Sequence, residues 1–331
     1  MFSRDIGIDL GTANVSIHVK GKGVVLDEPS VVAIESDTKK VLAVGEEAHR
    51  MVGRTPGNII AIRPLRDGVI ADFEITEIML KAFIDRVDGR SWYSKPRILI
   101  CAPTNITSVE QKSIREAAER SGAKDVFMEE EPKAAAIGAG MDIFQPSGNM
   151  VVDIGGGTTD VAVLSMGDVV TSSSLKIAGD KFDSAIMKYI KNKYKLLIGE
   201  RTSEDIKIRI GTVYDEGRRS EMDIRGRDMV TGLPLTITIR SEEVREALWD
   251  PVMSIVASAK SVLERTPPEL SADIIDRGVI LTGGGALLDG LDALLAEELK
   301  VPVLIAEDPM HCVVKGTGIL LDHLDKLGKR R

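Results

Sequence analysis

The chain has 331 residues, of which 43% are hydrophobic and 28% are charged, a composition typical of a globular protein of about two domains and not of a disordered or fibrous one. A net charge of −8 and an aromatic content of 4% argue against a nucleic-acid-binding protein, which usually presents a basic patch. The longest stretch without charged residues covers 12 positions, 98–109, whereas a membrane-spanning helix needs about 20 apolar residues. The N-terminus has no recognisable secretory signal, so we expect a cytoplasmic protein.

The first part of the sequence predicts a sheet followed by helices. Four β-branched runs, IGIDL, VSIHV, GVVL and SVVAI, lie within the first 34 residues and predict an antiparallel meander. Thr107 and Glu110 form the pattern of a helix-capping box, and Gly122 stands where such a helix would end. Pro132 is typical of a first helical turn and predicts a second helix that runs through Met141. Apolar residues expected on the buried face of the first helix are Val109, Ile114, Ala117 and Ala118.

The second half of the sequence repeats the opening pattern. Asp9 ends an apolar strand and is followed by Leu-Gly-Thr-Ala-Asn; Asp153, 144 residues later, ends another and is followed by Ile-Gly-Gly-Gly-Thr-Thr-Asp. Such an internal repeat predicts two related lobes. Further expected elements are helices at 180–194, at 203–210 with Ser203 as the N-cap and at 241–265, a hairpin at 222–239, and strands near 279 and 301.

Three glycine turns have the composition of anion-binding loops. They lie at 11–12, 155–159 and 283–285, and glycine leaves backbone N–H groups free to approach a phosphate. Neither the P-loop nor the Rossmann fingerprint is present, and a single turn of this kind is often only structural. Asp9 and Asp153 precede two of the turns, where a bare carboxylate would be costly to bury. A Mg²⁺ ion held by both aspartates would explain them; the alternative is that each aspartate caps its own turn.

The same motifs resemble those of a known superfamily. DLGTAN (9–14), DIGGGTTD (153–160) and LTGGGALL (281–288) are similar to the two phosphate motifs and the adenosine motif of the actin, Hsp70 and sugar-kinase superfamily. Within it, nearly the whole chain resembles the MreB/Mbl family of bacterial actins, the rod shape-determining proteins. In VVKGTG (313–318), Lys315 departs from the family pattern, in which a less polar residue is expected. The segments that carry the resemblance are EPSVVA (28–33), VGRTPGNI (52–59), RPLRDGVIADF (63–73), EEPKAAAIGAG (130–140), LLIGERTSEDIK (196–207), IRGRDMVTGLP (224–234) and ERTPPELSADIIDRGVILTGGGALL (264–288).

The resemblance implies an α/β, actin-like ATPase fold with two related lobes around a nucleotide cleft. Each lobe would consist of a core and a small subdomain. The implied boundaries are 1–31, 76–148 and 311–331 for the core of lobe I (IA), 32–75 for the small subdomain IB, 149–182 and 252–310 for the core of lobe II (IIA), and 183–251 for the small subdomain IIB.

The cofactors that the resemblance implies are ATP and Mg²⁺, with Asp9 and Asp153 at the metal. Glu131 matches the position that orients the attacking water, and Thr158 would assist it. The two glutamates before Glu131 are expected to be solvated. The residues expected at the nucleotide are Thr12, Ala13, Asn14, Gly156, Gly157 and Thr158 at the phosphates, Glu204, Asp205, Ile206 and Lys207 at the ribose and base, and Gly284, Gly285, Ala286 and Leu287 along the adenosine.

The resemblance also implies a function. The chain is expected to be a weak ATPase whose hydrolysis is coupled to polymerisation. Its subunits would stack head to tail into protofilaments that pair antiparallel, and the filament would determine rod cell shape by organising peptidoglycan synthesis along the cylinder. The partners implied by the family are RodZ, MreC, MreD, RodA and penicillin-binding proteins, and no nucleic acid is expected.

An aromatic pair in a polar loop predicts contact with the cell membrane. Trp92 and Tyr93 lie in DRVDGRSWYSKPR, and aromatic residues of this type favour membrane interfaces. Basic neighbours, among them Arg86 and Arg97, would meet anionic lipid, and Phe2 would add a second contact. The protein would then bind peripherally to the inner face of the cell membrane. The alternative is that the pair folds back onto its own lobe.

Two other functions use the same fold. A small-molecule, sugar-type kinase would need a cleft aspartate as the base toward a substrate hydroxyl and insertions that shape a sugar pocket, and no such insertion is recognisable. An Hsp70-like chaperone would need an appended substrate domain, which is not expected in a chain that ends at Arg331.

Overall fold

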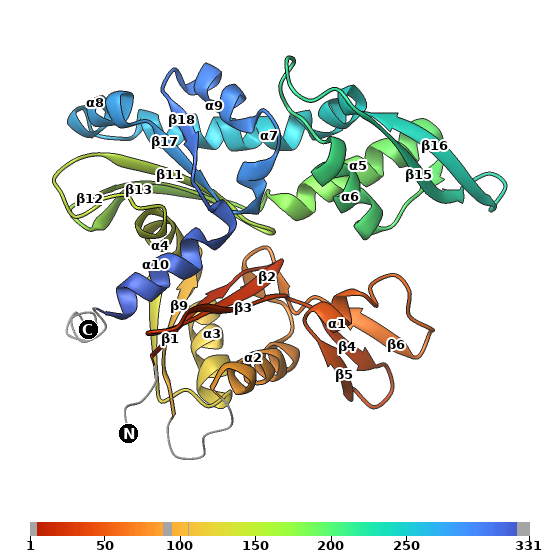
Figure 1. Ribbon diagram of the computed structural model, residues 1–331, viewed down its shortest axis with the longest axis horizontal. Helices are drawn as coiled ribbons and strands as arrows, with labels where there is room; N and C mark the ends of the chain where they lie inside the picture. The colour runs from red at the N-terminus through yellow and green to blue at the C-terminus, as the bar shows by residue number, and fades with distance from the viewer. Residues whose placement is uncertain (1–4, 89–94, 105, 323–331) are drawn as a thin grey trace.

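The computed structural model describes residues 5–88, 95–104 and 106–322 (Figure 1). They form two α/β lobes, each built on a five-stranded sheet, and a smaller sheet extends from each lobe. Figure 1 shows the two large sheets one above the other and both small sheets at the same end of the molecule. No helix of the described residues is long and apolar enough to cross a membrane.

Lobe I combines an antiparallel meander with two parallel strands. Its strand order is β10-β9-β1-β2-β3, with β1 at Asp5–Leu10, β2 at Asn14–Val19, β3 at Gly23–Pro29, β9 at Arg97–Ala102 and β10 at Asp125–Glu130. β1, β2 and β3 are antiparallel, as the β-branched runs predict, whereas β9 runs parallel to β1 and β10 parallel to β9.

Helices cover both faces of this sheet because side chains alternate along each strand. Ile98 and Ile100 of β9 pack with α2 (Phe73–Asp88) and α3 (Ser108–Arg120). Leu99 and Cys101 pack on the other side with α4 (Glu131–Gly138) and α10 (Cys312–Leu321). The capping box at the start of α3 is formed as predicted, with Thr107 and Glu110 bonded to each other's backbone N–H groups.

Lobe II repeats the arrangement of lobe I. Its strand order is β13-β12-β11-β17-β18, with β11 at Asn149–Ile154, β12 at Thr159–Ser165, β13 at Asp168–Leu175, β17 at Val279–Thr282 and β18 at Val303–Ile305. β11 is antiparallel to β12 and parallel to β17, just as β1 lies between β2 and β9. The two related lobes expected from the internal repeat are therefore confirmed. The helices of this lobe are α5 (Gly179–Tyr194), α7 (Ser241–Glu264), α8 (Pro268–Arg277) and α9 (Leu291–Leu299).

A small sheet extends each lobe. Lobe I adds β5-β4-β6 (Val41–Val44, Val32–Glu35 and Ile59–Ile62), the helix α1 (Glu46–His49) and the ribbon β7-β8 (Leu65–Arg66 and Val69–Ile70). Lobe II adds β14-β15-β16 (Leu196–Leu197, Glu221–Asp228 and Pro234–Arg240) and α6 (Glu200–Ile210). The β15–β16 hairpin occurs where the sequence predicts it. The subdomain boundaries that the resemblance implies stay a prediction.

Three local expectations about helices are wrong. Val109 is 73% exposed, because its position falls off the helical repeat of the buried residues in α3. α4 ends at Gly138 and does not reach Met141, since Gly140 adopts a left-handed conformation with φ of 81°. Ser203 is not a cap but lies inside α6, where its hydroxyl donates to the carbonyl oxygen of Asp183 at 2.7 Å.

The fourth β-branched run does not continue the meander. The first sheet ends at Pro29, whose ring nitrogen has no hydrogen to donate to a further ladder. Residues 32–35 form β4 in the small sheet instead. The chain therefore leaves the large sheet directly after β3.

Two helices form the core between the lobes. Figure 1 shows α4 and α10 between the two large sheets, and their apolar side chains form one cluster with Leu99 of lobe I and Val151 of lobe II. The helices touch through glycine, because a Cβ atom at Gly316 would overlap the carbonyl oxygen of Ala134 and lie 2.6 Å from its carbonyl carbon. The two helices are thus joined by a backbone-to-backbone contact, and the apolar cluster around them connects the sheets of both lobes.

Gly316→Ala should destabilise the protein, although alanine is the better helix former by about 1 kcal/mol. Forcing a methyl group into a filled core usually costs about 1–3 kcal/mol, so we expect a net decrease in the free energy of unfolding, measured by urea denaturation. Gly57→Ala is the control, because a Cβ atom there meets nothing within 4 Å. Equal stabilities of the two variants would contradict the packing argument.

Candidate functional site

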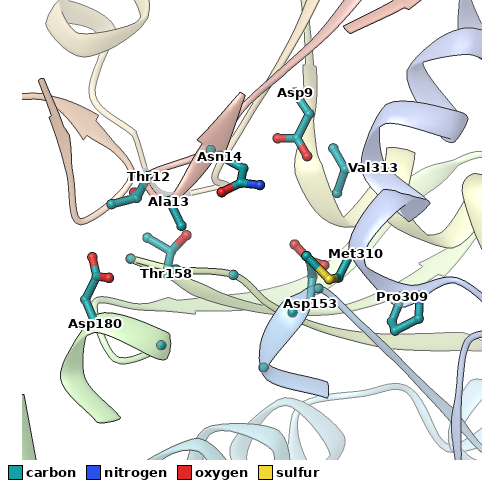
Figure 2. Close-up of a pocket in the computed structure, with 18 of the residues that line it drawn as sticks. Asp9, Thr12, Ala13, Asn14, Asp153, Thr158, Asp180, Pro309, Met310 and Val313 are labelled. Atoms are coloured by element: carbon teal, nitrogen blue, oxygen red, sulfur yellow. The ribbon is translucent and has the colours of Figure 1, made fainter. Parts of the chain in front are cut away.

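A cavity of about 500 Å³ opens between the two lobes (Figure 2). Its walls come from the turn after β1, the turn between β11 and β12, the start of α5, one face of α6, and the segments 283–288 and 309–313. The three glycine turns, far apart in the sequence, therefore line one cavity. The predicted site residues in its lining are Asp9, Thr12, Ala13, Asn14, Glu131, Asp153, Gly156, Gly157, Thr158, Glu204, Lys207, Gly284, Gly285 and Leu287.

The first glycine turn is fixed by a serine behind it. Ser30 is fully buried. Its hydroxyl donates to the carbonyl oxygen of Gly11 at 2.7 Å, and its N–H donates to the carbonyl oxygen of Ala13 at 2.8 Å. These two bonds hold the backbone of the turn in one conformation.

The second glycine turn packs directly against the first. A Cβ atom at Gly156 would lie 2.5 Å from the Cβ of Ala13, and one at Gly157 would overlap the hydroxyl of Thr12. The N–H of Asp180, in the first turn of α5, donates to the carbonyl oxygen of Gly156 at 2.8 Å. Only glycine lets the backbones of the two lobes approach this closely, so N–H groups from both lobes lie within reach of one anion.

Two carboxyl groups face the cavity from opposite lobes. Figure 2 shows Asp9 and Asp153 directed toward the same space, and Thr282 Oγ1 donates to Asp153 Oδ1 at 2.6 Å. The pKa of each aspartate is raised from 3.8 to about 7, mainly by desolvation. The charge of Asp153 raises the pKa of Asp9 further, and the charge of Asp160 raises the pKa of Asp153 further. Mg²⁺ is usually held by one or two carboxylates together with water and phosphate oxygens. The donor set therefore fits this ion.

Glu131, at the start of α4, lines the same cavity and is 8% exposed. Burial raises its pKa well above 4.5, and the charges of Asp160 and of the two aspartates above raise it further. Of its two acidic neighbours, Glu129 is not solvated as expected but lies 3.1 Å from the Nζ of the buried Lys133.

The helical repeat of α6 divides the predicted residues 204–207. Glu204 and Lys207, three positions apart, line the cavity. Lys207 Nζ lies 2.9 Å from Asp183 Oδ1; desolvation raises the pKa of Asp183 to about 6, and the lysine opposes this rise. Asp205 is exposed and Ile206 is fully buried in the core of lobe II, and neither belongs to the lining.

The third glycine turn packs on the end of β11. A Cβ atom at Gly285 would lie 2.9 Å from the Cβ of Ile154, so the turn follows the strand closely. Gly284, Gly285 and Leu287 line the cavity, whereas Ala286 is fully buried behind them.

Exposed apolar side chains line the cavity near this turn. Leu287, Ile208 and Met310 are 55%, 64% and 47% exposed. Exposed apolar groups that gather in a cavity are typical of a ligand-binding surface. Ile208 and Met310 carry no signal in the sequence that would have identified them.

Sequence reasoning missed other residues of the cavity. Arg63 and Gly68 line it from the small sheet of lobe I, and Ser30 supports it from behind; all three lie in segments recognised only as family motifs. Asp27 of β3 accepts hydrogen bonds from the side chain of Asn14 at 3.1 Å and from a serine of β2. Asp27 lies at the cavity because the register of the sheet pairs it with Ser16 of β2, and no motif in the sequence identifies it as a site residue.

The predicted membrane residues Phe2, Trp92 and Tyr93 lie outside the described residues. Two of the basic residues expected to meet lipid are engaged within lobe I. Arg97 binds the carboxylate of Asp5 with two nitrogens, at 2.8 and 2.7 Å, and Arg86 NH1 lies 3.2 Å from Glu28 Oε1.

Comparison with known proteins identifies a family. Residues 3–329 match the family model described as MreB/Mbl protein. The chain is 78% identical to the cell shape-determining protein Mbl of Bacillus cereus, over 100% of this chain and 99% of the relative. It is 53% identical to the cell shape-determining protein MreB of Escherichia coli, over 99% of this chain and 96% of the relative.

A solved structure shares the fold. The crystal structure of MreB5 of Spiroplasma citri bound to AMPPNP superimposes with a TM-score of 0.94 and 41% sequence identity, over 100% of this chain and 99% of that chain. The same protein has also been solved with ADP. The resemblance expected from the sequence motifs is confirmed, and with it the actin-like ATPase fold.

Asp153→Asn should change how the stability of the ligand-free protein depends on pH. The folded-state pKa of Asp153, about 7, is higher than the unfolded value near 3.8, so its contribution to stability is complete below pH 4 and is lost as the pH rises through 7. Asparagine keeps the acceptor for Thr282 and does not ionise. Relative to the unmodified protein, the free energy of unfolding of the variant should therefore increase from pH 5 to pH 8.

Urea denaturation at several pH values, without nucleotide or divalent ions, measures this difference. Asp205→Asn is the control, because its carboxyl group is exposed. A difference between Asp153→Asn and the unmodified protein that stays constant with pH would contradict the assignment of a buried, ionising carboxyl group.

Proposed function

The chain belongs to the MreB/Mbl family of bacterial actins and shares its cell shape-determining, cytoskeletal role, and we propose that it fulfils this role as an ATP-dependent filament on the cell membrane. The nucleotide would bind with Mg²⁺ in the cavity between the lobes. Hydrolysis would be slow and coupled to polymerisation, so that the protein acts as a weak ATPase and not as a metabolic enzyme.

The contact between the two glycine turns is the observation that carries this proposal. Thr12, Ala13 and Asn14 of lobe I and Gly156, Gly157 and Thr158 of lobe II surround the same part of one cavity, and Gly156 and Gly157 pack against Ala13 and Thr12. A polyphosphate bound there would be held by N–H groups of both lobes. The AMPPNP bound by the related MreB5 supports a nucleotide as the ligand.

The remainder of the nucleotide would extend toward α6 and the third glycine turn. Glu204 and Lys207 offer polar groups for the ribose, and Gly284 to Leu287 would follow the adenosine. The exposed side chains of Ile208, Leu287 and Met310 offer apolar surface to a planar base. The predicted Asp205, Ile206 and Ala286 would act indirectly, by supporting these residues from outside the cavity lining.

Asp9 and Asp153 would hold the Mg²⁺ ion. Bound there, the ion would neutralise charge on the phosphates. Burying two carboxylates near each other is unfavourable in the free protein, as their raised pKa values indicate. A cation at this place therefore removes an electrostatic cost of closing the lobes.

Glu131 and Thr158 would position the attacking water. Both line the cavity and are at most 9% exposed. In its ionised form Glu131 would accept a hydrogen bond from the attacking water and take up a proton late in the reaction, and its raised pKa favours that uptake. In-line attack on a phosphate needs little more than such positioning.

A nucleotide that joins the lobes would also favour assembly. Contacts between different faces of neighbouring subunits that do not close into a ring give open filaments. Head-to-tail protofilaments would pair antiparallel and guide peptidoglycan synthesis, with RodZ, MreC, MreD, RodA and penicillin-binding proteins as the partners expected from the family. The filament would be cytoplasmic, and Trp92, Tyr93 and Phe2 would attach it peripherally to the inner face of the cell membrane.

Glu131→Ala should leave ATP binding intact and lower the rate of hydrolysis by roughly 100-fold, the usual effect of losing a group that handles the proton of the reacting water. ATP affinity is measured by isothermal titration and hydrolysis by phosphate release. Glu130→Ala is the control, since Glu130 is not part of the cavity lining. Unchanged phosphate release by Glu131→Ala would overturn the assignment.

Negative-stain electron microscopy on anionic vesicles with Mg-ATP tests the filament and its membrane contact together. We expect paired filaments on the lipid surface. The double variant Trp92→Ser, Tyr93→Ser should bind ATP normally and leave the vesicles bare, because the aromatic contact is lost. Dispersed particles that still hydrolyse ATP would contradict the filament, and continued binding of the variant would contradict the role of the aromatic pair.

A further inference from the structure

A tight turn in the small sheet of lobe I reaches into the cleft. Asp67 and Gly68 connect β7 to β8, whose register pairs Leu65 with Ile70 and Arg66 with Val69. Both turn residues have positive φ, 51° and 76°, as in the two-residue hairpin turns for which Asp-Gly is a preferred sequence. The turn belongs to the motif RPLRDGVIADF, to which the proposed function gives no role.

Gly68 contacts the phosphate turns of both lobes. Its N–H donates to Thr12 Oγ1 at 3.0 Å. A Cβ atom at Gly68 would lie 2.7 Å from Thr158 Cγ2 and 2.9 Å from Pro103 Cγ. Real Cβ atoms do not approach other atoms so closely, so the position has room for glycine only.

The methyl group of Thr158 is thereby confined on one side. Two residues further along the chain, in β12, Asp160 Oδ1 accepts hydrogen bonds from the N–H and hydroxyl of Thr104, both at 3.1 Å. A threonine side chain has three staggered rotamers, and a methyl group seated against Gly68 fixes the direction of the hydroxyl.

Thr12 is confined in a similar way. Its hydroxyl accepts the N–H of Gly68 on one side, and on the other its Cβ lies 2.9 Å from where a Cβ of Gly157 would be. Thr12 is 4% exposed and Thr158 is 9% exposed. Alanine at position 68 would keep the N–H that binds Thr12, whereas its methyl group would collide with that of Thr158.

We propose that the Asp67-Gly68 turn is a positioning element for hydrolysis, which seats the methyl group of Thr158 and so aims its hydroxyl at the attacking water. The inference rests on the proposed function and adds to it a residue at the edge of the cavity that acts through another side chain. Gly68 acts through Thr158, and hydrolysis depends on the small sheet of lobe I being closed onto the cleft. A displaced hydroxyl lowers the rate of the chemical step without lowering the affinity for ATP.

Gly68→Ala tests this directly, with Gly53→Ala as the matched control. Gly53 lies in the same small subdomain region and also has a positive φ, 69°, but a Cβ atom there meets nothing within 4 Å. Both variants bear the same kind of backbone strain, and only Gly68→Ala pushes a methyl group against Thr158. We expect kcat for Mg-ATP to fall about 10- to 100-fold in Gly68→Ala, with KM and the affinity for AMPPNP within threefold of the control.

The second variant tests the same contact by changing Thr158 instead of Gly68. Thr158→Ser keeps the hydroxyl and removes the methyl group, so the hydroxyl is free to turn and kcat should fall while KM is retained. In the double variant Gly68→Ala, Thr158→Ser, the new methyl group occupies space that the old one left. Its kcat should therefore exceed that of Gly68→Ala alone, a rescue that backbone strain would not produce.

Three results would overturn the inference: a kcat of Gly68→Ala equal to that of Gly53→Ala, a loss of ATP affinity with unchanged kcat, or a double variant no faster than Gly68→Ala. Should Gly68→Ala not fold, an unchanged kcat of Thr158→Ser would overturn it as well. Failure of the proposed function looks different, because the unmodified protein and Gly53→Ala would then also fail to bind or hydrolyse ATP.

Discussion

The two lobes touch inside the cleft through glycine residues, and the site depends on this contact. A side chain at Gly156 or Gly157 would occupy the space of Ala13 or Thr12. Because glycine allows this close approach, the N–H groups of two turns that are separated by more than 140 residues of sequence lie close enough to bind one anion. A ligand held by both turns favours the closed arrangement of the lobes by its difference in affinity between the closed and open states.

Electrostatics reinforce this coupling between ligand and closure. Burial raises the pKa of Asp9, Asp153, Glu131 and Asp160, all of them in or beside the cleft. Asp153 and Asp160 are also direct neighbours across β11 and β12, where like charges are unfavourable. Such groups are stable in a closed site only when they are protonated or share a cation. Closure without a cation and closure with one therefore differ in free energy and in proton uptake.

The sequence predicted the parts of the site that are coded locally. The strand, aspartate and glycine pattern identified both glycine turns that line the cavity and their relation, because each signal lies within ten residues. Residues that come to the cleft through tertiary structure had no such signal. Ser30 lies there because the chain leaves the large sheet after β3, and Gly68 lies there because the β7-β8 ribbon folds back onto the cleft. The sequence also did not show which residues of 204–207 face the cavity. The helical repeat directs Ile206 into the core, whereas Lys207 lines the cavity.

The contacts between the lobes differ in kind at the two ends of the cleft. Around α4 and α10 the contact is a buried apolar cluster that includes Leu99 of lobe I and Val151 of lobe II, and such close-packed contacts resist deformation. Near the small sheets the lobes meet through a polar pair, Arg63 and Glu200, whose atoms Nε and Oε2 lie 3.9 Å apart. Exposed ion pairs of this kind contribute about 0–1 kcal/mol. Opening of the cleft should therefore separate the small sheets and preserve the apolar cluster around α4 and α10, so the state of the cleft changes the shape of the end that carries both small sheets.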